Sequence, residues 1–302
     1  MHNRSNSHIY RIVMSTFVIY RYQFAPIKDR EPSLSGNMNV DLSDEELMDK
    51  KQDIFSDILK IEKSGYFRNP RKRRFGHLLI YNQGGISVFR LANTRKTRLE
   101  SHFVKQEITY NPSSIVIVDN RKDCQFIAIE KSGAFEDTDT VSKILQYTFR
   151  EILRNEGLHI NIQKMYATKD FWNVVTANSG KINKIRFIFS YPNLPTLNTN
   201  VKEMIKTMSK SNKCSTSALE FEAESGKALE IFQTDKDMVN LAETGADSGD
   251  EIKVRLNGSK SMISVGKTER TIELNDIVTA LSGNLFQKGY EKVCEIFNKL
   301  LR

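Results

Sequence analysis

Two apolar runs separated by a polar turn constrain the fold more than any other feature of the sequence. Ser114–Asp119 and Cys124–Ile129 are rich in isoleucine and valine and flank Asn120-Arg-Lys-Asp123. β-Branched residues favour strands, and asparagine and aspartate favour turns, so this segment predicts an antiparallel hairpin. The runs His77–Tyr81 and Ile86–Leu91 flank a Gly-Gly turn and predict a second hairpin. The N-terminal half of the chain is therefore expected to contain an antiparallel sheet.

Two amphipathic helices accompany these strands. The first begins with the capping box Ser43-Asp-Glu-Glu46 and ends at Gly65, and the second runs from about Asp137 to Gly157. The β-branched and aromatic stretch Ile9–Tyr20 predicts a long strand ahead of both helices. Helices packed on an antiparallel sheet define an α+β domain.

The second half of the chain mixes strands and helices in the same way. Lys181–Phe189 alternates like a strand, and residues 198–211 predict a helix with an exposed row of lysines. We expect two domains, a β-rich α+β domain with a basic loop over residues 1–160 and a basic strand-helix α+β domain over residues 161–302. The expected fold is thus an antiparallel-sheet N-terminal domain with packed helices, then a smaller α+β domain and a C-terminal helical region.

The C-terminal helical region, residues 275–302, has more apolar positions than one stripe facing a single core requires. Two interpretations remain open. The segment either docks on its own domain or forms a two-fold contact with a second copy, which would make the protein a homodimer and double each basic surface.

The charge and cysteine content narrow the class of protein. The net charge is +8, and it is concentrated in residues 60–105, with 12 basic and 2 acidic residues, and in 166–215, with 8 and 2. Such zones favour a polyanion-binding surface. Three widely spaced cysteines argue against a disulfide framework and against a zinc site, and no metal or cofactor motif is present. The apolar N-terminal stretch is interrupted by Arg11 and is too short to span a bilayer, so we expect a cytoplasmic protein.

The densest basic stretch is Phe67–Gly76, in which five of seven consecutive positions from Arg68 to Arg74 are cationic. Pro70 prevents a continuous helix, so an exposed loop leading into a sheet is expected. The alternative to a phosphate-binding role is a loop that is only solvated. Together with the other basic segments it gives the candidate nucleic-acid-binding residues Arg68, Arg71, Lys72, Arg73, Arg74, Arg90, Arg95, Lys96, Arg98, Lys181, Lys184, Arg186, Lys202, Lys206 and Lys210.

One short pattern points to an enzyme instead. Arg154-Asn-Glu-Gly-Leu-His159 resembles the Arg-Asn-x-x-x-His motif of the HEPN ribonucleases, which would imply that Arg154 and His159 assist RNA cleavage across a dimer. The family places this motif within a helix, whereas Gly157 is expected to end one here. The usual Gly-rich phosphate loops and hydrolase nucleophile motifs are missing from the sequence.

The order of elements also suggests a family. A β-rich N-terminal half, the hairpin Ile115–Ile129, the helix 138–155 and a basic strand-plus-helix unit resemble the RexA exclusion proteins of lambdoid phages. In outline they are also similar to the DNA-binding KwaB subunit of the Kiwa anti-phage system. The resemblance covers residues 75–235 and carries no diagnostic motif, so it assigns no individual residue. It implies a dimeric DNA-binding sensor or effector in phage exclusion or antiphage defence, coupled to a membrane-protein partner encoded nearby.

The sequence therefore leads to one main hypothesis and two alternatives. The main hypothesis is a non-enzymatic, sequence-tolerant DNA-binding protein without cofactor or metal, with RNA left open as the ligand. The alternatives are a HEPN-like ribonuclease using Arg154 and His159, and a non-catalytic interaction protein that binds an acidic partner.

Overall fold

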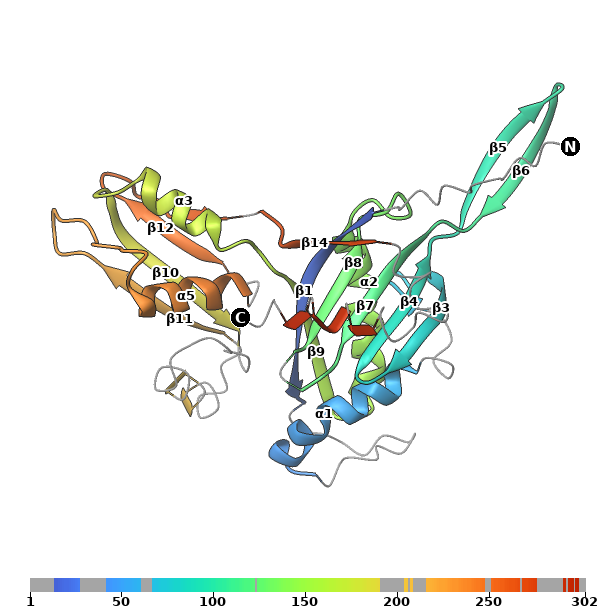
Figure 1. The fold of residues 1–302 in the computed structure, drawn as a ribbon, viewed down its shortest axis with the longest axis horizontal. Helices are drawn as coiled ribbons and strands as arrows, with labels where there is room; N and C mark the ends of the chain where they lie inside the picture. Colours follow the sequence, from blue (N-terminus) through green and yellow to red (C-terminus); the bar gives the residue numbers. More distant parts are fainter. Residues whose placement is uncertain are drawn as a thin grey trace, which may run out of the picture.

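The computed structural model describes residues 14–27, 42–60, 67–122, 124–190, 204–205, 207–208, 216–247, 251–266, 268–275, 290–291, 293–295 and 297–298. Its two larger sheets are antiparallel and carry helices, so the predicted α+β class is confirmed (Figure 1). None of the described helices is both long and apolar enough to cross a bilayer.

An eight-stranded sheet forms the larger unit, with the strand order β14-β1-β8-β7-β4-β3-β2 and with β9 also paired to β1. The strand β1 pairs with β8 along one side. Along its other side β1 pairs first with β14 and then with β9. Val18 has one partner in β8 and the other in β14, whereas Tyr20 has one partner in β8 and the other in β9. Both predicted hairpins are present, as β3–β4 and β7–β8. The strands of this sheet are β1 (Met14–Pro26), β2 (Phe67–Arg68), β3 (Arg74–Gln83), β4 (Ile86–Ala92), β7 (Ser113–Asp119), β8 (Phe126–Glu130), β9 (Leu158–Lys164) and β14 (Thr271–Asn275).

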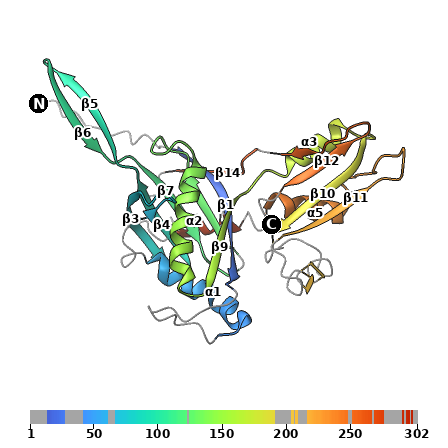
Figure 2. The same cartoon turned by 180° about the vertical axis from the view of Figure 1, so that it is seen from behind.

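The helices α1 (Asp44–Leu59) and α2 (Thr138–Arg154) pack on one face of this sheet, as Figure 2 shows for α2. The predicted capping box begins α1, because the Ser43 side chain accepts from the Glu46 backbone and the Glu46 carboxylate accepts from the Ser43 backbone. The core beneath the helices is rich in aromatic rings, among them Tyr22, Phe24, Phe55 and Phe149.

The opposite face of the sheet holds a second apolar cluster, to which the C-terminal part of the chain contributes. Val293 and Phe297 are buried in it, and the ring of Phe297 stacks on that of Phe126 with centroids 6.0 Å apart. The described residues between 290 and 298 are helical, whereas 276–289 lie outside the described part of the chain. At least these two apolar positions are covered by the protein's own sheet.

The smaller unit is built on a four-stranded sheet with the order β11-β10-β12-β13. The helices α3 (Lys169–Ala177) and α5 (Lys236–Asp247) pack on one face, where Phe171 and Leu241 join a core with Phe187. The predicted basic helix at 198–211 lies almost entirely outside the described residues. The strands are β10 (Ile182–Ser190), β11 (Thr216–Glu222), β12 (Ile252–Leu256) and β13 (Ile263–Val265).

Two adjacent segments, residues 166–167 and 268–269, connect the units, and we call them the neck. The chain leaves the large sheet after β9 and returns to it through β14, so the smaller unit is inserted between two strands that both pair with β1. Tyr166 and Glu269 form an isolated antiparallel β-bridge, and the backbone N–H of Ala167 donates to the carbonyl of Thr268 at 2.9 Å. The domain boundary expected at residues 160 and 161 lies within β9.

A long hairpin that the sequence did not reveal projects from the larger unit (Figures 1 and 2). Its strands, β5 (Arg95–Ser101) and β6 (Val104–Tyr110), continue β4 and β7 but form a separate two-stranded sheet. We call this hairpin the arm. Its root is fastened to the body, because the Asn93 amide donates to the carbonyl of Ala134 at 2.7 Å and the Arg95 guanidinium donates to the same carbonyl at 2.8 Å.

Candidate nucleic-acid interface

The basic stretch forms a tight hairpin turn between β2 and β3 rather than a long loop, and we call residues 68–74 the basic turn. Pro70 occupies the second position of the turn, where its fixed φ is favourable. The Lys72 N–H donates to the carbonyl of Asn69 at 2.8 Å, and the Asn69 side chain accepts from the Arg73 N–H at 3.0 Å. Lys72 adopts a φ of 59°, a strained value for a residue with a side chain. The turn therefore presents its cations on a defined backbone.

Strand register brings three arginines to one face of the large sheet. Arg68 and Arg74 are direct cross-strand partners, and Arg90 is the partner of Leu78, two residues along the same side of β3 from Gly76. Their neighbours Phe67 and Phe75 point to the opposite, buried face. All three arginines are exposed. An anion bound on this face would therefore be attracted by cations from more than one strand.

Arg73 has a structural contact of its own. Its guanidinium donates to the Asn93 side chain at 2.7 Å and to the carbonyl of Thr94 at 3.2 Å, and it lies 5.0 Å from the centre of the Phe75 ring. Because Asn93 and Thr94 immediately precede β5, Arg73 fastens the basic turn to the root of the arm. It is therefore a poor position at which to test charge alone.

The remaining candidates of the first basic zone lie on the arm. Arg95 contacts the carbonyl of Ala134, and Lys96 forms an ion pair with Glu107 at 2.6 Å. Arg98 stands opposite the same Glu107 in the register of β5 and β6. Part of the positive charge of the arm is thus balanced locally.

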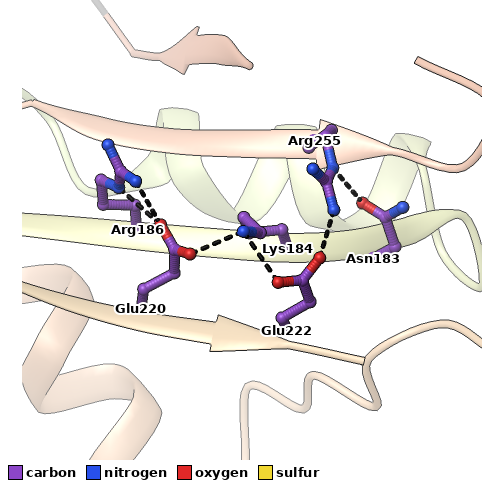
Figure 3. Close-up of polar contacts among 6 residues, drawn as sticks. All are labelled: Asn183, Lys184, Arg186, Glu220, Glu222 and Arg255. Atoms are coloured by element: carbon purple, nitrogen blue, oxygen red, sulfur yellow. Dashed lines mark hydrogen bonds and ion pairs between the residues drawn. The ribbon is translucent and has the colours of Figure 1, made fainter. Parts of the chain in front are cut away.

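Two cations of the second basic zone, Lys184 and Arg186, take part in a cross-strand network of ion pairs (Figure 3). Lys184 lies 2.6 Å from Glu220 and 2.8 Å from Glu222, and Arg186 lies 2.6 Å from Glu220. Hydrogen bonds from Lys184 lower the pKa of both glutamates, and their hydrogen bonds raise the pKa of Lys184. Arg255 from β12 closes the network on Glu222. This face of the smaller sheet is therefore a stabilising ladder of mixed charge.

The network does not account for the other four candidates of that zone. Lys181 is exposed in the turn before β10. Lys202, Lys206 and Lys210 lie outside the described residues.

The two residues of the ribonuclease-like pattern lie in different elements. Arg154 is the last residue of α2, Gly157 adopts a φ of 77°, and His159 is an exposed residue of β9 paired with Ala25. Partial burial lowers the pKa of His159, and the nearby charge of Arg150 lowers it further. The helix thus ends between the two residues, unlike the within-helix motif of the HEPN ribonucleases.

Two features of this region had no adequate signal in the sequence. The face shared by Arg68, Arg74 and Arg90 depends on strand register, which residue types alone do not fix. The arm turns at His102-Phe103, both with positive φ, where hairpins normally use Asn-Gly or Asp-Gly. Without a turn signature, only the alternation of Arg98, Leu99 and Glu100 hinted at a strand.

Comparison with known proteins leaves the interpretation to the structure. No model of a known protein family matches the chain, and a search of curated proteins finds no significant relative.

Proposed function

We propose that this protein binds DNA with little sequence preference, through the basic turn and the adjacent Arg90. The proposal rests on a difference in ion pairing between the cations of this region and those of the smaller sheet. Among the described residues no ion pair engages Arg68, Arg71, Lys72 or Arg90, whereas Lys184 and Arg186 are held by carboxylates. Exposed cations without acidic partners retain their full attraction for phosphate.

The arrangement favours contact with the DNA backbone over reading of bases. The cations project from a tight turn and from one strand face, so they can follow phosphates along a strand. Four phosphate contacts on B-DNA correspond to a log–log salt slope of about 3.6, and to a loss of about 100-fold in affinity between 50 and 200 mM salt. Binding of this type is tolerant of sequence and sensitive to ionic strength.

Our first prediction concerns the four cations without described ion pairs. Changing Arg68, Arg71, Lys72 and Arg90 to alanine should make the salt slope shallower by about 3.6 units and weaken binding at low salt. The measurement is fluorescence anisotropy of a labelled duplex over a series of salt concentrations, repeated with single-stranded DNA and with RNA. Arg73 is left unchanged because it holds the root of the arm.

The matched control removes the same charge elsewhere, by changing the exposed residues Lys50, Lys143, Lys169 and Lys260 to alanine. Its slope should stay close to that of the unmodified protein. Equal slopes for both variants would reject the basic turn as the DNA site. Binding of an acidic protein but not DNA would favour the interaction-protein alternative.

A role in phage exclusion or antiphage defence, in the cytoplasm and beside a membrane-protein partner, is the cellular part of the proposal. The defence role and the membrane-protein partner are supported by the resemblance to the RexA and KwaB proteins alone. The same two variants test it, because phage plating efficiency should change with the basic-turn variant and not with the control. Protection that survives loss of DNA binding would separate the two parts of the proposal.

A further inference from the structure

The arm presents an apolar face that nothing in the described part of the chain covers. Alternation along β5 and β6 puts Tyr110, Ile108 and Leu99 on one side, together with Val104 beside the turn. The tip residue Phe103 is 97% exposed. The other exposed fractions are 52% for Leu99, 57% for Val104, 40% for Ile108 and 43% for Tyr110.

The opposite face of the arm is polar and nearly balanced in charge. Lys96 pairs with Glu107 at 2.6 Å, and Lys105 lies 3.9 Å from Glu100. A DNA strand on that face would meet two carboxylates, which disfavours the arm as a second phosphate-binding surface. Among the described residues, the face of the arm that lacks a contact partner is thus the apolar one.

The tip of the arm accepts backbone strain in order to present large side chains. His102 and Phe103 have φ values of 51° and 63°, the left-handed region that glycine or asparagine occupies at low cost. A turn selected only for folding would use Asn-Gly. The ring of Phe103 is therefore placed for contact, and an isolated two-stranded hairpin is only marginally stable in water without such contact.

From these observations we propose that the arm is a dimerisation element whose apolar face packs against the same face of a second copy. A two-fold contact requires a surface complementary to itself, and an apolar face without charged residues at its centre meets that requirement. The five side chains expose roughly 500 Å² at the usual size of such residues. Two copies would bury about 1,000 Å² in total, near the lower limit for a specific interface.

The charges at the root select an antiparallel arrangement of the two arms. Arg95 is the cross-strand partner of Tyr110 and lies on the apolar side of the arm. Parallel arms would bring the two copies of Arg95 together, which like charges disfavour. Antiparallel arms put each Phe103 beside the partner's Tyr110, so that rings cover both ends of the contact.

Our second prediction compares two adjacent positions on opposite faces. Ile108→Glu puts a charge into the proposed contact and should weaken the dimer by at least about 100-fold. Thr109→Glu adds the same charge to the polar face and should leave the dimer intact. Sedimentation velocity at about 10 μM protein, without nucleic acid, measures the mass. Phe103→Ser is the second variant, since a residue exposed at the tip supports no core, and it should also shift the equilibrium toward monomer.

Cross-linking tests the arrangement of the arms. With a short thiol cross-linker Gln106→Cys, near the middle of the arm, should join two copies, whereas His102→Cys at the tip should not. Three results would overturn the proposal: an unmodified protein that is monomeric, an Ile108→Glu variant that remains dimeric, or efficient self-cross-linking at position 102. If the unmodified protein is a monomer and Phe103→Ser loses binding to DNA or to lipid vesicles, the ligand whose binding is lost is the one that contacts the apolar face of the arm. Because no nucleic acid is present, failure here leaves the proposed DNA binding untouched.

Discussion

At the scale of single residues, Glu269 in the neck forms ion pairs with two lysines of the larger unit. Its carboxylate lies 2.7 Å from Lys131 and 2.6 Å from Lys164, and Lys164 lies 3.0 Å from Asp139 at the start of α2. Burial raises the pKa of Glu269, but hydrogen bonds from the two lysines outweigh it and the pKa is lowered. The ionised carboxylate therefore stabilises the folded neck.

Our third prediction is that Glu269→Gln lowers the free energy of unfolding by about 1 kcal/mol at pH 7, since the site is only partly buried. A lowered folded pKa contributes stability above the pKa of the unfolded chain, and that contribution is lost as the pH falls through the folded value. The difference between variant and parent, measured by urea unfolding, should thus shrink in acid. The control is Glu224→Gln, whose pair with Lys227 is exposed on both sides and should matter little. A constant difference at all pH values would argue for a steric effect.

At the scale of elements, the His102-Phe103 turn of the arm is strained but presents the exposed Phe103 ring for contact. Our fourth prediction is that replacing His102-Phe103 by Asn-Gly favours the hairpin itself by about 1 kcal/mol, because it removes left-handed strain. The same change should weaken the dimer, because it removes the Phe103 ring. Hydrogen exchange of the arm amides, compared in the Ile108→Glu background, reports the first effect, and sedimentation reports the second. Stronger association with Asn-Gly would assign the tip a purely conformational role.

The elements that could be predicted from sequence are those with local signals. The Ser43–Glu46 capping box and the alternating runs of β3–β4 and β7–β8 specify themselves within a few residues. The arm lacks a turn residue, and β14 joins β1 from the other end of the chain. The basic turn was visible as composition, but the pairing that separates Arg68 from Lys184 depends on which glutamates lie across each strand.

At the scale of the whole molecule, the smaller unit is an insertion whose ends meet. Our fifth prediction is that replacing residues 168–267 by Asn-Gly, a two-residue turn between the adjacent Ala167 and Thr268, leaves a folded larger unit. Because the described cations of β10 are paired, the salt slope of DNA binding should be unchanged. Circular dichroism and the anisotropy titration measure the two outcomes. A shallower slope would return Lys181, Lys202, Lys206 and Lys210 to the interface.

The meeting of these ends also bears on the order of events during synthesis. The ribosome releases β1 before the insertion and β14 after it, so one edge of β1 stays without its β14 partner until the insertion has been made. Closing an unstructured loop of about 100 residues costs about 3 kcal/mol more than closing a turn of four. An insertion that folds first removes this difference, because its neck already holds Ala167 against Thr268. A substitution that slows folding of the insertion would then expose the β1 edge on nascent chains, where strand edges recruit other chains into aggregates.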